Sequence, residues 1–325
     1  MSHLSRTCAL LLGYSLISGC GLGPFAEEGG GSDNLPIHGG GPFTPLPVDF
    51  DTPADEPYVV VTATKSLLDP SVEQQDDNTF LIHYTRLDEE GSTIWKVDLP
   101  SIHEVSGTPE LVLSADQDWE QGQVRSVSLL REGEKVTLYY EGGDLDPAIG
   151  RAVSIDGGQT YVKDVNNPIV EGLDPNITKA EGRHILVYAD MANQRIMLRE
   201  SPDELSFGPA RVILAARSSE QGTIDQAGVA APALRISRTL DGQELFGLYY
   251  EAWSLDNDGE VFETVGYQAS FGGEKWERFL DGNEIVDSGL FGSGGPSPIL
   301  GPVSGLLFYH QKRQGRGRIA AAESP

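Results

Sequence analysis

The sequence is poor in cysteine, in methionine and in positive charge. Its 325 residues include 2 Cys and 3 Met, and 23 Lys and Arg stand against 49 Asp and Glu. Both cysteines lie within the first 20 residues, so the rest of the chain cannot form a disulfide scaffold. The net charge of −26 repels phosphate backbones, which argues against nucleic-acid binding and leaves solubility as the simplest role of the acids.

Several motifs of metal and cofactor chemistry are also missing. The chain has no His-Glu-x-x-His pair, no cysteine cluster, no Gly-Lys-Ser phosphate loop and no Gly-x-Ser-x-Gly elbow. The run Asp256–Glu260 has glycine at its fourth place, so it predicts a hairpin turn rather than a calcium loop. We therefore expect no cofactor and no metal ion.

The N-terminus has the features of a secretory signal. Arg6 precedes an apolar run from Ala9 to Ile17 that is too short to span a membrane permanently. The residues Ile17-Ser18-Gly19-Cys20 resemble a bacterial lipobox, which implies cleavage before Cys20 and a diacylglycerol on its thiol. The alternative is an ordinary signal peptide that contains Cys20. We expect residues 1–19 to be a lipoprotein signal peptide, and the mature chain to be anchored in the bacterial cell envelope, in the outer membrane because Gly21 rather than Asp follows the cysteine.

Residues 20–56 are rich in glycine and proline and have no apolar periodicity. Such a composition predicts a flexible tether that holds a domain away from its anchor. The domain then occupies residues 57–325.

A repeated pattern of strands fills this domain. Each copy has a strand that opens at a turn, an apolar strand that ends in tyrosine, and a third strand that ends in a small residue and serine. The tyrosines are separated by 56, 48, 62 and 59 residues, which leaves room for four strands per interval. They are Tyr84, Tyr140, Tyr188, Tyr250 and Tyr309.

Five such copies predict an all-β, five-bladed β-propeller with four antiparallel strands in each blade. The 39 Gly and 20 Pro agree with many short strands and tight turns. The chain ends at the third strand of the last copy, so we expect an N-terminal strand near Tyr58–Thr62 to complete that blade and close the ring.

The order Asp-Pro-x-apolar, tyrosine-ended strand, Ser-x-Asp-Gly resembles the five-bladed propellers of the arabinanase, levansucrase and invertase group of glycoside hydrolases, which is family 43-like. The resemblance covers residues 57–325. Residues Ser154–Tyr161 also resemble the Asp-box turn of sialidases, which is a folding element on the rim. A true sialidase would need six blades and three arginines that face one point.

The resemblance implies catalytic carboxylates on the innermost strands of successive blades, because glycosidic cleavage needs an acid and a charge-compensating base. Asp69 and Asp174, each followed by proline, match two of these positions. The alternative is that each caps its own turn. The third acid is missing, because the blade-four position carries Ala231. Candidate substitutes are Glu251, Asp144 and Asp225.

Four residues are candidates for substrate binding: Arg125, Tyr140, Tyr188 and Trp253. Arg125 would bind a sugar hydroxyl or carboxylate, or else form an internal ion pair with Asp69 or Asp174. The aromatic rings would stack on sugars, or else pack between blades.

These observations predict a surface-anchored, monomeric lipoprotein with a glycosidase-like propeller and an incomplete catalytic set. Its central funnel would bind carbohydrate or a cell-surface protein, and only the lipid anchor would contact the membrane. The alternative is an active glycoside hydrolase that cleaves a polysaccharide with paired carboxylates.

Overall fold

The computed structural model describes residues 43–45, 59–61, 65–75, 79–102, 107–239, 241–255, 259–278, 285–286, 292–300, 305–313 and 316–324. Within these ranges the chain forms β-strands and two short 3₁₀ turns, η2 (Asp118–Glu120) and η3 (Met191–Asn193). In the same ranges no helix has the length and apolar character needed to cross a membrane. The predicted all-β class is confirmed.

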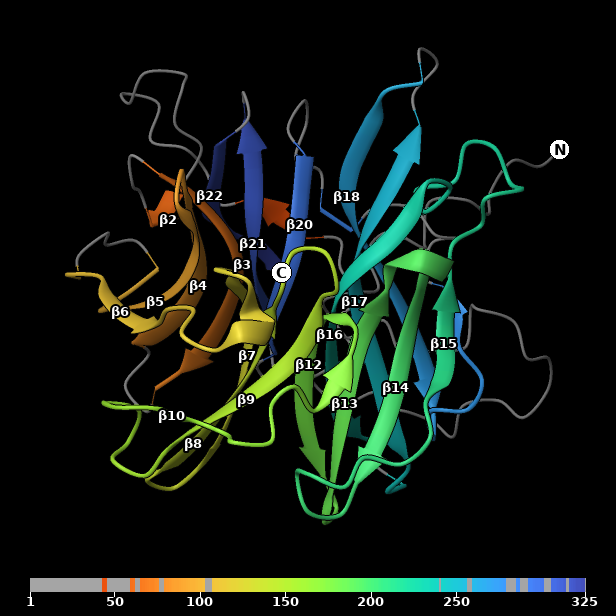
Figure 1. Cartoon of the computed structure of the whole chain (residues 1–325). Coiled ribbons are helices and arrows are strands. Elements are labelled where there is room, and N and C mark those ends of the chain that lie inside the picture. Colours follow the sequence, from red (N-terminus) through yellow and green to blue (C-terminus); the bar gives the residue numbers. More distant parts are fainter. Residues whose placement is uncertain are drawn as a thin grey trace, which may run out of the picture.

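The strands form five antiparallel sheets that are arranged as the blades of a propeller (Figure 1). Blade I contains β3 (Ser66–Gln74), β4 (Phe80–Asp88), β5 (Gly91–Leu99) and β6 (Glu110–Leu113). Blade II contains β7 (Val124–Glu132), β8 (Lys135–Gly142), β9 (Ala148–Ser154), β10 (Val162–Lys163) and β11 (Val170–Glu171). Blade III contains β12 (Leu173–Ala180), β13 (Arg183–Asp190), β14 (Arg195–Ser201) and β15 (Arg211–Ala215). Blade IV contains β16 (Gly228–Arg238), β17 (Glu244–Leu255), β18 (Val261–Phe271) and β19 (Glu277–Arg278).

Blade V joins the two ends of the chain. Its own strands are β20 (Gly292–Leu300), β21 (Gly305–Arg313) and β22 (Arg316–Ser324), and its outer edge is formed by β2 (Val59–Val61) and β1 (Thr44–Pro45). Figure 1 shows β2 beside β22, and Val59 is in register with Ala320. The predicted closure of the ring by an N-terminal strand is confirmed.

The propeller begins earlier in the chain than the sequence indicated. Strand β1 lies inside the segment 20–56 that was expected to be a tether, and it pairs with β22. Phe43 is 2% exposed, donates its backbone N–H to Ile285 and packs edge-on against Tyr249. Phe43 and β1 therefore belong to the folded domain, while residues 1–42, with the predicted signal and Cys20, lie outside the described residues.

Burial of apolar side chains between neighbouring blades holds the ring together. Five apolar clusters of described residues each draw on two adjacent blades, as where Tyr139 of blade II meets Ile177 and Leu186 of blade III. Full burial of one such aliphatic side chain contributes ~1.5–3 kcal/mol. The repeated tyrosines lie on the second strands β4, β8, β13, β17 and β21 and are all buried, which explains their spacing along the chain.

The innermost strands share one irregularity that creates the site. In β3, β7, β12, β16 and β20 the pairing register shifts at a β-bulge at the same place. One residue of each bulge has a positive φ, namely Asp69 (49°), Ser126 (49°), Asp174 (49°), Ala231 (41°) and Gly295 (56°). We call these five the bulge residues. A bulge re-aims the side chain of its strand, and repetition by five aims one position of every blade toward the propeller axis.

Candidate functional site

The bulge residues and the residues that follow them line a pit where the five inner strands meet, which we call the funnel. It contains about 360 Å³ of space, part of it open to solvent. Proline follows the bulge residue in four of the five blades, which fixes the backbone on the far side of the bulge. Asp69 and Asp174 therefore face a common space, and the structure does not show them capping their own turns.

Each bulge residue is also held by the preceding blade. The residue that follows the repeated tyrosine on a second strand accepts a hydrogen bond from the backbone N–H of the next bulge residue. Thr85 thus accepts from Ser126 (2.9 Å), Glu141 from Asp174 (3.2 Å) and Glu251 from Gly295 (3.1 Å). Nδ1 of His310 accepts from Asp69 (3.3 Å) when the ring is neutral, and on protonation the same nitrogen becomes a donor to Oδ1 of Asp69. Bonds of this kind each contribute ~0.5–1.5 kcal/mol net and fix the bulges relative to one another.

Blade III has no side-chain acceptor after its repeated tyrosine, and this difference explains which group Asp174 binds. Ala189 occupies the place after Tyr188 and has no acceptor to offer. The N–H of Ala231 donates instead to Oδ2 of Asp174, at 3.2 Å. Asp174 therefore has one oxygen bound to the scaffold, and its other oxygen points to Ser126.

Ser126 joins the two candidate carboxyl groups. Its Oγ lies 2.9 Å from Oδ2 of Asp69 and 2.8 Å from Oδ1 of Asp174. A hydroxyl has one proton and can donate to only one acceptor at a time. Two ionised carboxylates would leave one of these contacts without a proton, so the geometry favours the state in which one carboxyl is protonated and donates to Ser126.

The surroundings make Asp174 the more readily protonated of the two. Burial and the negative charge of Asp69 raise the pKa of Asp174 above its ordinary value. Burial also acts to raise the pKa of Asp69, but the hydrogen bonds and charge of His310, together with Ser126, outweigh it and the pKa is lowered. The hydrogen-bonded order is thus Asp174 to Ser126 to Asp69, with the negative charge on Asp69.

The chain of polar groups continues into blades V and IV. Oδ1 of Asp69 lies 3.3 Å from Nδ1 of His310, and Nε2 of His310 lies 3.7 Å from Oε2 of Glu251. Burial lowers the pKa of His310, but Asp69 and Glu251 outweigh it and raise the pKa. Burial also raises the pKa of Glu251. Glu251, proposed from the sequence as a substitute acid, therefore does reach the edge of the funnel through Gly295.

Arg125 enters a different ion pair from those expected. Its Nε donates to Oε1 of Glu141 at 2.6 Å, and its side chain is 28% exposed. Burial, together with the negative charge that Asp174 carries when it is ionised, nevertheless outweighs Arg125 and raises the pKa of Glu141 to about 8. Glu141 was missed in the sequence although it follows Tyr140 as Glu251 follows Tyr250, and that shared position was the available signal.

The other candidates lie away from the pit. Tyr140 is fully buried and donates to Glu120, and Tyr188 is 4% exposed in the core between blades II and III, so neither ring has a free face. Trp253 is half-buried and donates to Glu251 at 2.7 Å. Asp225 is held by Arg217 and Arg278, and Asp144 is exposed at the β8–β9 turn. Of the three substitute acids, only Glu251 contacts the funnel.

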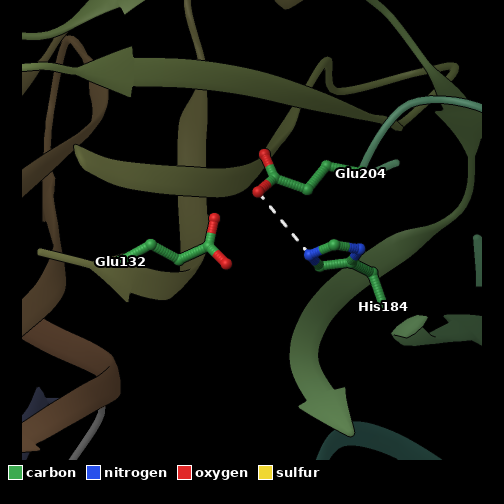
Figure 2. Close-up of side chains that lie close together, drawn as sticks. All are labelled: Glu132, His184 and Glu204. Atoms are coloured by element: carbon green, nitrogen blue, oxygen red, sulfur yellow. Dashed lines mark ion pairs between the residues drawn. The ribbon is translucent and has the colours of Figure 1, made fainter. Parts of the chain in front are cut away.

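Figure 2 shows a second group of acids and a histidine, between blades II and III. We call it the interface cluster: Glu132, His184 and Glu204, with their partners Lys135 and Arg151. Three ligand atoms come within 4.8 Å of one another there, but Lys135 contacts both oxygens of Glu204, at 2.8 and 2.9 Å. The ammonium group of Lys135 therefore occupies the position in which a metal ion would contact Glu204.

A comparable arrangement exists beside the funnel, where Glu251, Glu263 and His310 come together. Lys312 donates to Glu263 at 2.8 Å and already supplies a cation to this group. We assign a metal ion to neither group.

The Asp-box resemblance corresponds to a turn at the rim of blade II. Ser154 donates to Asp156 at 2.6 Å, and Asp156 accepts from the backbone and hydroxyl of Thr160. The blade III turn repeats the pattern with Ser201, Asp203 and Ser206. Both turns lie outside the funnel.

The fold and the site together define a five-bladed propeller of the kind found in glycoside hydrolases. The endo-arabinase from Bacteroides thetaiotaomicron superposes with a TM-score of 0.59 at 16% identity, over 82% of this chain and 97% of that one. A glycoside hydrolase from a family 130 study of β-1,2 mannosidic linkages in Candida mannan gives 0.64 at 13% identity, over 89% and 95%. A BT0996 complex with RGII gives 0.62 at 14% identity, over 82% and 90%.

No sequence family model matches the chain, and no curated protein matches it in sequence. At these identities the similarity establishes the fold. It confirms the five-bladed propeller expected from the repeat.

Proposed function

We propose that the funnel binds a carbohydrate, and that the protein does so at the cell surface as a lipoprotein anchored through Cys20. The observation that carries the binding proposal is the convergence of Asp69, Ser126 and Asp174 on one open pit. Carboxyl and hydroxyl groups fixed from the scaffold side offer both donors and acceptors to sugar hydroxyls. The known structures with this fold act on glycans according to their descriptions, which supports the same ligand class.

A single array of polysaccharides tests the binding. We expect isothermal titration to detect binding of arabinan, RGII fragments or β-1,2 mannan oligosaccharides, and Asp174→Ala, which removes the polar group, to weaken that affinity at least tenfold. Asp144→Ala is the matched control, because this exposed aspartate lies outside the funnel. Equal loss in both variants, or full affinity in Asp174→Ala, would place the binding surface elsewhere.

Hydrolysis of the bound glycan is the second candidate function, and the shared proton favours it. Glycosidic cleavage needs one carboxylic acid for the leaving oxygen and one carboxylate at the anomeric carbon, and the funnel holds one of each. Since both oxygens bond to one hydroxyl, they can be no farther apart than two hydrogen-bond lengths. That separation is below the ~6.5–9.5 Å of inverting enzymes and close to the ~5–5.5 Å of retaining ones.

The test of hydrolysis uses the glycan found in the array. We expect release of reducing sugar with retained anomeric configuration by NMR, and loss of turnover with retained binding in Asp69→Asn. Binding without any turnover in the wild type would leave the protein as a carbohydrate-binding module.

The anchor has a separate test. Metabolic labelling with an alkyne palmitate analogue should mark the wild-type protein, and Cys20→Ala should abolish the label. Labelling that survives in Cys20→Ala would exclude the lipobox.

A further inference from the structure

A second cavity lies farther along the inner strands than the funnel, on blades I, IV and V. It is lined by Val72 of β3, Arg235 of β16, Pro298 to Leu300 of β20, and residues of β17 and β18, and it contains about 820 Å³, part of it open solvent. Its lining residues on the inner strands follow the bulge residues of those strands by three to six positions. The cavity therefore differs from the funnel in place and in lining residues.

Arg235 is the only charged side chain in this lining, and it has no acidic partner among the residues that the structure describes. Its Nε donates to the carbonyl of Pro298 at 2.9 Å and its Nη1 to that of Leu234 at 3.0 Å. A guanidinium has five N–H donors, so these two bonds leave three for other acceptors.

The missing partner is not due to a shortage of acid, since the chain has a net charge of −26. Arg238, three residues along the same strand, pairs with Glu181, and Arg217 and Arg278 share Asp225. Burial lowers the pKa of Arg235, with only Tyr249 acting in the other direction. Arg235 is half-buried, so it is partly removed from water without a counter-ion, and an anion that enters the cavity would supply one.

Most side chains around Arg235 are apolar, and Ser237 adds one hydroxyl to the lining. Val72, Leu245 and Tyr267 are nearly buried, and Pro298 and Leu300 complete one side. Gly247 shapes the wall, because a Cβ at this position would lie 2.9 Å from the hydroxyl of Tyr267. One guanidinium fork matches the two oxygens of one carboxylate, and the apolar side chains beside it suit the hydrocarbon body of an organic acid rather than inorganic phosphate.

We propose that this cavity is a binding site for an organic carboxylate whose apolar body lies against Val72, Leu245 and Tyr267 while Arg235 binds its head group. The site is independent of glycan binding in the funnel. An occupant would also contact blades I, IV and V together and thereby stabilise the closed ring.

The experiment uses octanoate as the probe, with octanol and inorganic phosphate as comparison ligands. We expect octanoate to raise the melting temperature and to bind in isothermal titration, and octanol and phosphate to bind at least tenfold more weakly. Arg235→Gln should weaken octanoate at least tenfold, and Arg235→Lys, which keeps the charge but not the fork, should weaken it less. Arg238→Gln is the matched control and should change nothing.

Urea denaturation of each variant shows whether its fold is retained, and a crystal structure with octanoate locates the ligand if Arg235→Gln is unstable. No binding of octanoate by the wild type at millimolar concentration would overturn the proposal. So would equal affinity for octanol, a preference for phosphate, an undiminished affinity in folded Arg235→Gln, or octanoate density elsewhere.

Discussion

The protein buries carboxylates in two regions that differ in the cations beside them. In the interface cluster Glu204 contacts Lys135 and Arg151, and further accepts from Thr137. In the funnel Asp69 and Asp174 share one hydroxyl, Asp69 has only the titratable His310 beside it, and the nearby Arg125 is paired with Glu141. In the interface cluster cationic side chains neutralise the carboxylate. In the funnel a shared proton reduces the repulsion between the two carboxyl groups.

This difference separates a structural role from a functional one. Removing one member of a cluster of paired charges lowers the stability of the fold, because the remaining charge loses a partner. Two adjacent carboxyl groups such as Asp69 and Asp174 have pKa values that shift in opposite directions, so one of them can donate a proton. Such pairs are a feature of reactive sites. Substitutions should therefore reduce stability in one region and function in the other.

The largest effect on stability should come from Glu204→Gln. The change removes the counter-ion that Arg151 and Lys135 share and leaves Arg151 with Asp164 and Lys135 with the more distant Glu132. We expect a loss of about 1.5–3 kcal/mol in the free energy of unfolding. Urea denaturation measures it. The control is Glu110→Gln, which breaks the exposed pair with Lys96 and should cost less than about 1 kcal/mol. Similar losses in both variants would show that the interface cluster adds no more than a surface pair.

The corresponding change from carboxyl to amide in the funnel, Asp174→Asn, should leave the free energy of unfolding nearly unchanged. In Asp174→Asn the amide oxygen still accepts from Ala231 and the amide nitrogen can donate to Ser126, as the protonated carboxyl does. We therefore expect a change of less than about 1 kcal/mol by urea denaturation. A loss as large as that of Glu204→Gln would make Asp174 a structural residue and remove the contrast between the two regions.

The two regions should also respond to pH in opposite directions. The pKa of Glu204 is lowered from 4.5 to about 2, where Lys135 and Arg151 outweigh burial, so its contribution is present above pH 4.5 and is lost as pH falls toward 2. The pKa of Glu141 is raised from 4.5 to about 8, so the folded state binds the extra proton and loses stability as pH rises between those values.

Urea denaturation across pH 2 to 9 gives the free energy of unfolding as a function of pH. Glu204→Gln should reduce the loss of stability at acid pH, and Glu141→Gln should reduce the decline between pH 4.5 and 8. An unchanged decline in Glu141→Gln would show that Arg125 keeps Glu141 ionised throughout.

The sequence predicted the ring better than the chemistry at its centre. The tyrosines that end the second strands recur because each must fill a space between blades, and that requirement is visible as a spacing. Asp69 and Asp174 were visible because proline follows each of them. Their partnership was not, since Ser126 has neither a following proline nor a charge to mark it.

The expectations for Tyr140 and Tyr188 show why residue type alone misplaces a site. An aromatic side chain suits both a sugar face and a core, and only the neighbouring blade decides between them. Ala189 is a second example, because the absence of an acceptor there becomes meaningful only when Ala231 is seen to donate to Asp174. Relations between blades are set by the closed ring and cannot be read from one strand.

The smallest change that tests the comparison is Ser126→Ala. The variant should fold, because Ala231 occupies the equivalent bulge position with a φ of 41°, and the loss of the bridging hydroxyl should cost about 0.5–1.5 kcal/mol. Carbon-13 labelling of the aspartate carboxyls lets NMR follow each titration, with Asp69→Asn and Asp174→Asn for assignment. In the wild type one carboxyl should titrate above its ordinary pKa and one below, and in Ser126→Ala the pKa of Asp69 should rise because Ser126 helps to lower it. Titration of both carboxyls in the ordinary range in the wild type would mean that no proton is shared across the funnel, and the contrast with the interface cluster would then rest on stability alone.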